Sequence, residues 1–273
     1  MAENSLSRRD FNVLEKIKDP EANPMAAVLI DPTLPKDPNY KDEPEVYERI
    51  AQKERDIVLA MQQAEKQLAS RKSSTIDIVK EYHQCVSKLG DLISEHPNYA
   101  SARNNRAQAL RRLYGDAILL RQGGQSWTAL VQAGSIERTK PATLLLEDLD
   151  TAINLLTPKS AFASVSPQAA NTLSRAYTQR GAIYHRTAMK FDDRIDHQYE
   201  VQYPALVDLG ARRETGWSEN DFEEAASRDF AAGGRYGNEI AKGLAVNTNP
   251  TAKLCGAMVR EAMKKEYGPA YSS

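Results

Sequence analysis

The sequence is poor in aromatic residues and in the residues that favour β-strands. Aromatic residues make up 7% of the 273 positions, and runs of Val, Ile and Thr are nearly absent. The residues that dominate instead, chiefly Ala, Leu, Gln, Glu, Arg and Lys, lose little conformational freedom on entering a helix. We therefore expect an all-α fold.

Long apolar runs are also missing. No stretch approaches the roughly 20 consecutive apolar residues of a membrane-spanning helix, and the first residues lack the apolar core of a secretory signal. The two cysteines, Cys85 and Cys255, each lie in a helical apolar pattern, which favours buried, reduced thiols over a disulfide. We expect a cytoplasmic protein, or a nuclear one, with no membrane partner.

Charge of one sign is not in excess. The 36 Lys and Arg residues nearly balance the 37 Asp and Glu residues, so the formal net charge is -1. Nucleic acids are bound by basic surfaces. One local basic cluster exists on a single helical stretch, consisting of Arg103, Arg106, Arg111 and Arg112. No aromatic residues alternate with these arginines to stack on bases, so we expect no nucleic-acid partner.

Groups suited to catalysis or metal binding are sparse. The histidines at 83, 96, 185 and 197 show no metal-ligand spacing, and neither cysteine has a C-x-x-C partner. The glycine pairs at 123–124 and 233–234 lack the strand-then-helix context of a phosphate-binding loop. Nothing supplies a nucleophile, a base and an orienting group together. We expect no enzyme, no cofactor and no metal.

Proline divides the chain into an arm and a helical domain. Six prolines lie between positions 20 and 44. Because proline fixes φ and removes a donor, residues 1–44 predict an arm with only short helices, one of them at 8–18. Residues 45–267 are interpreted as one domain with irregular inserts near 116–141 and 190–219, and 268–273 as a flexible tail. The sequence does not decide whether the arm packs on the domain.

Apolar residues in the domain recur at spacings of three, four and seven, as amphipathic helices require. The predicted helices span 45–71, 100–114, 141–156, 168–189, 218–232, 237–246 and 250–267. One more helix follows a candidate N-cap at residues 73–75; its apolar stripe runs from Ile78 to Ile93 and ends at residues 96–98. We place Pro141 in the first turn of its helix, where proline is tolerated. Gly233 and Gly234 are interpreted as the end of another helix.

Two short segments indicate an internal repeat. Residues 104–109 (NNRAQA) and 178–183 (TQRGAI) share two polar residues, then Arg, then a small residue. A small residue lets a partner helix approach closely, and we expect Arg106 to point into its helix pair. With closing prolines at 97 and 158, the pattern predicts helix-turn-helix units at 54–98, 99–158 and 170–234, followed by a capping helix pair. An ordinary helical bundle is the alternative.

These units resemble the tetratricopeptide repeat, and further motifs are similar to the family named for tetratricopeptide repeat protein thirty-six. The motifs are Asn105-Arg106-Ala107-Gln108-Ala109, Leu146-Glu147-Asp148-Leu149, Gln179-Arg180-Gly181, Arg228-Asp229-Phe230 and Asn249-Pro250-x-Ala252-x-Leu254-Cys255-x-x-Met258. The resemblance implies a right-handed superhelix of antiparallel helix pairs, with about three repeats and C-terminal capping helices. The sequence departs from the family at the two inserts and in its long first helix pair.

In such arrays the first helix of each pair lines a concave groove that binds a polypeptide. The resemblance places these side chains on the groove: Asn105, Gln108, Arg112, Arg175, Gln179 and Arg186. Amide and guanidinium donors suit a partner that bears carboxylates, such as an acidic peptide terminus.

Some tetratricopeptide domains hold the Glu-Glu-Val-Asp terminus of heat-shock chaperones with a clamp of Lys, Asn and Arg residues. Asn105 matches one clamp position, Arg175 falls on a lysine position, and Gln179 replaces an arginine. The Lys and Asn of the first unit are not found. The clamp is therefore incomplete.

The resemblance implies a non-enzymatic adaptor, similar to a co-chaperone, that is linked to heat-shock chaperones and to tyrosine metabolism. An alternative stays open at this point. The chain could be a structural scaffold subunit of a larger complex that binds no chaperone tail.

Overall fold

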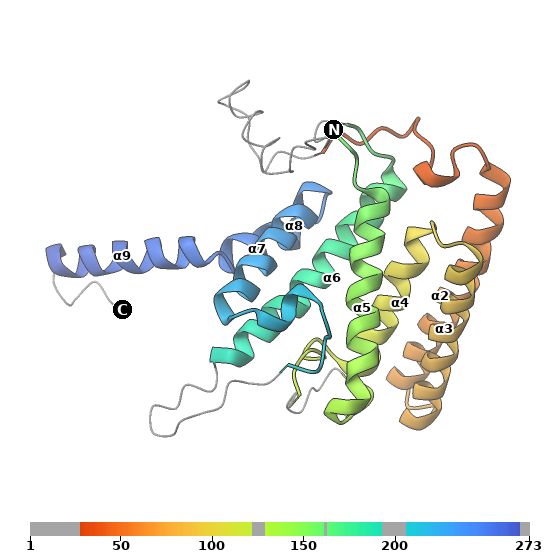
Figure 1. The fold of residues 1–273 in the computed structure, drawn as a ribbon, viewed down its shortest axis with the longest axis horizontal. Coiled ribbons are helices and arrows are strands. Elements are labelled where there is room, and N and C mark those ends of the chain that lie inside the picture. Colours follow the sequence, from red (N-terminus) through yellow and green to blue (C-terminus); the bar gives the residue numbers. More distant parts are fainter. Residues whose placement is uncertain (1–27, 122–128, 161–162, 193–205, 268–273) are drawn as a thin grey trace.

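A computed structural model describes residues 28–121, 129–160, 163–192 and 206–267, and these ranges are helical (Figure 1). Their eight α-helices are α2 (Pro44–Ala69), α3 (Thr75–Glu95), α4 (Ala100–Tyr114), α5 (Ser135–Leu156), α6 (Pro167–Asp192), α7 (Glu219–Arg235), α8 (Glu239–Asn247) and α9 (Pro250–Tyr267). Two short 3-10 turns, η1 (Pro38–Tyr40) and η2 (Arg213–Gly216), complete the elements of these ranges. The predicted all-α class is confirmed, whereas the tetratricopeptide-type superhelix stays a prediction.

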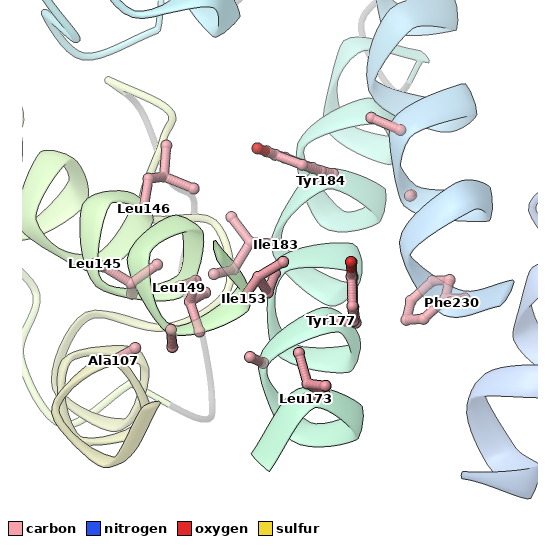
Figure 2. Close-up of a cluster of buried hydrophobic side chains, with 14 of the residues drawn as sticks. Ala107, Leu145, Leu146, Leu149, Ile153, Leu173, Tyr177, Ile183, Tyr184 and Phe230 are labelled. Carbon is pink, nitrogen blue, oxygen red and sulfur yellow. The ribbon is translucent and has the colours of Figure 1, made fainter. Parts of the chain in front are cut away.

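Each helix from α2 to α7 packs against the next one along the chain. In addition, α2 contacts α4 and α4 contacts α6, so alternate helices form a row of their own. One apolar core lies among α2, α3 and α4, around Ile57, Leu89 and Leu113. A larger core extends from α4 to α8, and Figure 2 shows the part of it where α5, α6 and α7 face one another.

Two buried ion pairs occupy equivalent places in successive helix pairs. Arg106 of α4 donates two hydrogen bonds to Asp148 of α5, at 2.6 and 2.8 Å. Arg180 of α6 donates two to Asp229 of α7, both at 2.7 Å. Both carboxylates are buried. The arginine that the internal repeat shares therefore joins the two helices of each pair, as expected for Arg106.

The start of α5 differs from the prediction. The helix begins at Ser135, so Pro141 lies inside it and not in its first turn. The reason is a cap further upstream, because the Glu137 carboxylate accepts a hydrogen bond of 2.9 Å from the backbone N–H of Gly134. The capping interaction satisfies an N-terminal donor and lets the helix extend through the proline.

The prediction that Gly233 and Gly234 end a helix is wrong, since α7 continues to Arg235. Both glycines are buried, and their hydrogen side chains allow close packing. A Cβ atom on Gly233 would lie 2.7 Å from Oγ1 of Thr178 in α6, and one on Gly234 would lie 2.9 Å from Cβ of Lys242 in α8. The glycine pair therefore makes room for two neighbouring helices.

The two inserts pack on each other where they are described. Leu120 and Leu206 form an isolated antiparallel bridge, and the N–H of Val207 donates to the carbonyl of Leu119 at 2.8 Å. The apolar side chains of these segments are buried, namely Ile118, Leu119, Leu120, Val207 and Leu209. The described residues of the inserts therefore contribute to the core, and the predicted insert ranges are helical from Ser135 onwards in the first and up to Asp192 in the second.

The described part of the arm packs on the helical domain. Val28 donates its N–H to the carbonyl of Arg235 at the end of α7, at 3.0 Å. Further on, Asp31 and Leu29 exchange backbone hydrogen bonds with Val165, just before α6. The short helix predicted at 8–18 and the tail at 268–273 lie outside the described residues.

Replacing Asp148 with Asn should lower the free energy of unfolding by about 3–5 kcal/mol, because Arg106 would then be buried without its counter-charge. Urea denaturation measures this. The matched control is Glu224→Gln on α7, whose exposed pair with Arg228 spans 3.9 Å and should change stability by less than about 1 kcal/mol. Equal small effects of both substitutions would show that the buried pair does not hold α4 against α5.

Candidate functional site

A groove runs along the row formed by α2, α4 and α6. It consists of two hollows of about 330 and 450 Å³ that share four lining residues, Val58, Gln62, Asn105 and Arg175. Lys36 and Asp37 of the arm border the first hollow, and Asn238, which caps α8, borders the second. We call this feature the α2–α4–α6 groove.

The structure brings together part of the predicted groove set. Asn105, Gln108, Arg175 and Gln179 line the α2–α4–α6 groove. Arg112 and Arg186 do not line either hollow.

Arg112 pairs instead with a carboxylate of α2. Its Nε donates to Glu65 at 2.6 Å, and this hydrogen bond lowers the pKa of the Glu65 carboxyl below its ordinary value. Tyr82 donates to the same carboxylate at 2.7 Å. The Glu65 carboxylate, at the edge of the second hollow, is therefore held by two donors of the same chain.

Glu54 forms part of the first hollow and is 7% exposed. Tyr99 donates to one of its carboxylate oxygens at 2.5 Å, and the Asn105 side-chain amide donates to the other at 2.7 Å. Burial raises the pKa of Glu54, whereas these hydrogen bonds and the charge of Arg175 oppose the shift. The amide at the predicted clamp position thus already binds an acid of this chain.

Gln179 of α6 offers an unused acceptor to the groove. Its Nε2 donates to the Asn104 side-chain oxygen at 2.8 Å and to the Asn104 carbonyl at 3.3 Å. Its Oε1 is buried and has no hydrogen-bond partner within the described ranges. A buried acceptor without a partner costs roughly 1–3 kcal/mol. A donor that entered the groove would remove this cost.

Arg175 lies one helical turn before Gln179 and is exposed on the same groove. Positions four apart share a helix face, so Arg175 and Gln179 project from the same side of α6. Across the described part of the chain, Arg175 forms no hydrogen bond or ion pair, although its charge acts on Glu54. The groove residues therefore include an exposed cation and, one helical turn away, a buried acceptor without a partner in the described ranges.

Sequence reasoning missed Glu54, Gln62, Glu65 and Asn238 as groove residues. For Glu54 a signal was present, because it lies between Ile50 and Ile57 on the apolar stripe of its helix. A charged residue on such a stripe must be satisfied inside the fold. Asn238 gave no signal, since it enters the groove only through the packing of α8.

The arginine cluster that raised the question of nucleic acid is neutralised within the chain. Arg103 and Arg106 both contact Asp148, at 3.4 and 2.6 Å. Arg111 pairs with Asp116 at 2.7 Å, and Arg112 pairs with Glu65. These arginines therefore act as internal partners of carboxylates.

A third hollow, of about 390 Å³, is bordered by α5, α6 and η2 and is lined by ion-paired side chains. Arg212 contacts Asp150 at 2.5 Å and Glu214 at 3.1 Å, and Arg180 contacts Asp150 at 2.5 Å. Its lining carries three arginines and two carboxylates, each with an ion-pair partner, so this hollow offers no unpaired group comparable to Arg175.

The remaining chemistry-bearing residues are scattered. No group of three His, Cys, Asp or Glu residues suited to a metal ion occurs in the described ranges, and no helix there is long and apolar enough to cross a membrane. Cys85 is buried as expected, and burial raises the pKa of its thiol. The expectation of burial is wrong for Cys255, which is exposed because α9 does not pack along another helix.

Fold and groove together define an all-helical protein of stacked helix pairs with a polar groove on one row of helices. No family model matches the chain, and no solved structure matches it. The chain is 35% identical over 267 residues to the L-tyrosine degradation gene cluster protein hmgX of Aspergillus fumigatus, covering 96% of this chain and 93% of that protein. The chain therefore belongs to the family of that protein.

The buried Glu54 predicts a specific pH dependence. Its pKa in the folded protein lies above the value of 4.5 for an unperturbed glutamate. Between these two values the folded state binds more protons than the unfolded state, so this group lowers stability as pH rises. As the pH rises from about 4.5 towards neutral, the free energy of unfolding of the wild type should therefore decrease relative to that of Glu54→Gln.

Urea denaturation across that pH range, with Glu224→Gln as an exposed control, checks the prediction. A difference between wild type and Glu54→Gln that is constant with pH, or that grows in favour of the wild type as pH rises, would contradict it.

Proposed function

We propose that the protein is a non-enzymatic adaptor in L-tyrosine degradation that holds a polypeptide segment of a partner protein in the α2–α4–α6 groove. The link to tyrosine degradation comes from the name of the Aspergillus fumigatus relative. The binding role comes from the groove itself. The protein acts in the cytoplasm or nucleus.

The observation that carries the proposal is the pairing of Arg175 with the Oε1 atom of Gln179. One is an exposed cation and the other a buried acceptor without a partner, and the two residues line the same groove one helical turn apart. A polypeptide presents N–H donors and oxygen acceptors alternately along its length. It can therefore supply both missing partners at once.

The other groove residues suit the same ligand. Side-chain amides line the second hollow, from Gln62, Asn105, Gln108, Gln179 and Asn238. Amides donate and accept hydrogen bonds without adding charge, which matches the requirements of a peptide backbone. The apolar side chains of Val58 and Met61 add contact surface between these amides.

The state of the groove acids supports a binding role over catalysis. Glu54 is held by Tyr99 and Asn105, and Glu65 by Arg112 and Tyr82. A general base needs a free lone pair within reach of a substrate proton. Carboxylates that are bound on both oxygens serve structure better than proton transfer.

Helix pairs with a groove on their first helices also fit the tetratricopeptide arrangement, which we propose for this chain. A heat-shock chaperone tail is then a second candidate partner, and the free guanidinium of Arg175 favours it. Against it stands Asn105, because its amide already donates to Glu54.

Affinity capture from cells that degrade L-tyrosine tests the groove. Three baits are compared: the wild type, Arg175→Asp, and Arg228→Asp as a control of equal charge change. Arg228 lies on α7 with a side chain 71% exposed and outside the groove. Arg175→Asp places a negative charge beside Glu54. The amount of each partner recovered with this bait should therefore be about tenfold or more below the amount recovered with the wild type or with Arg228→Asp.

Recovery of the same partners in equal amounts by all three baits would contradict binding in the groove and would favour the structural scaffold instead.

A titration with a Glu-Glu-Val-Asp peptide separates the chaperone candidate. A hydrogen bond to a charged group contributes about 1.5–3 kcal/mol, so Arg175→Ala should weaken binding of this peptide roughly tenfold or more. The measurement is calorimetric titration of wild type and variant. No binding to the wild type, or equal affinity for both proteins, removes the chaperone tail as a partner.

A further inference from the structure

Helix α9 differs from the helices before it in how little it is covered. Figure 1 shows it extending away from the packed array. Leu254, Met258 and Val259 are 62%, 62% and 61% exposed. Apart from its first turns, where Lys253 pairs with Glu223 of α7, the helix has few contacts with the array.

The exposed apolar residues of α9 form one stripe. Leu254, Cys255, Met258, Val259 and Ala262 follow one another at spacings of one, three or four, which places them on one side of a helix. A helix that keeps such a stripe in water loses the main source of its stability. Burial of the α9 stripe under another segment would therefore stabilise this helix.

The chain itself carries a matching segment. Residues 8–18, outside the described ranges, have Phe11, Leu14 and Ile17 at the spacing of one helix face. Pro20 follows, where such a helix would have to end. The segment is long enough to cover about three turns of α9.

Its attachment point lies within reach of α9. Val28 is hydrogen-bonded to the carbonyl of Arg235, at the end of α7, and α9 starts beside Glu223, near the beginning of the same helix. Arg235 follows Glu223 by 12 positions along the helix, which corresponds to about 18 Å. Residues 19–27 bridge up to about 30 Å when extended, so residue 18 can reach the first turns of α9.

We propose that residues 8–18 form an amphipathic helix that packs its Phe11, Leu14 and Ile17 side chains on the apolar stripe of α9. Because the segment is tethered, its effective concentration is in the millimolar range, well above that of a second copy of the chain. The contact joins the N-terminal arm to the C-terminal helix α9. It also covers Cys255, in the middle of the stripe.

The thiol of Cys255 reports on the contact. Cys85 is 2% exposed and reacts only on unfolding, so a native-state thiol reagent such as dithiobisnitrobenzoate labels Cys255 alone. If nine chains in ten are closed, Cys255 in the wild type should react about tenfold more slowly than in Leu14→Asp. Asn12→Asp, on the opposite side of the predicted helix, introduces the same charge and should leave the wild-type rate unchanged.

Three results would overturn the proposal. The first is a wild-type Cys255 that reacts as fast as that of Leu14→Asp. The second is an equal increase in rate with Asn12→Asp. The third is protection that grows with protein concentration, which would identify a second copy of the chain as the covering partner. Circular dichroism verifies that the Leu14→Asp protein keeps its helical array folded.

Discussion

The architecture depends on two buried arginine–aspartate ion pairs that occupy equivalent positions in successive helix pairs. Arg106 with Asp148 and Arg180 with Asp229 each join the first helix of a pair to the second. A bidentate contact of this kind fixes both the distance and the rotation of the two helices. Taking one partner away would leave a charge buried without compensation, so the arrangement tolerates little variation.

The rotation that these pairs impose also creates the groove. In each unit the residue just before the arginine is an amide, Asn105 in α4 and Gln179 in α6. When the arginine points into its own helix pair, the residue just before it turns its side chain towards the first helix of the preceding pair. Gln179 reaches Asn104 in this way and links α6 to α4. Within one short motif, the arginine thus determines how the helix pair packs, and the amide residue before it contributes to the groove.

Most helices could be predicted from the sequence because their apolar stripes are long and regular, and α4 and α9 begin and end where expected. The errors have local physical causes. Because of the cap at Gly134, α5 starts upstream of Pro141 and not at it. Because α8 packs closely on α7, Gly234 lies inside α7 and does not end it. Cys255 lies on a good helical stripe, but periodicity does not reveal whether another element covers that stripe.

The candidate site was harder to predict than the fold. The tetratricopeptide resemblance placed Asn105, Arg175 and Gln179 on one surface, and the structure brings them together. It could not show that Asn105 is engaged by Glu54, since that contact joins residues 51 positions apart. The consequence for function is specific. Among the described residues, the groove presents the guanidinium of Arg175 without an ion pair and the Gln179 side chain with an unsatisfied acceptor, in place of a full carboxylate clamp.

The most direct measurement is amide hydrogen exchange on the complex with a partner recovered by affinity capture. Binding in the groove predicts slower exchange in the middle of α2, α4 and α6, around Glu54, Gln108 and Gln179, and unchanged exchange in α3 and α5. Protection confined to α3, α5 or the exposed side of α7, with the groove helices unaffected, would contradict a polypeptide-binding groove.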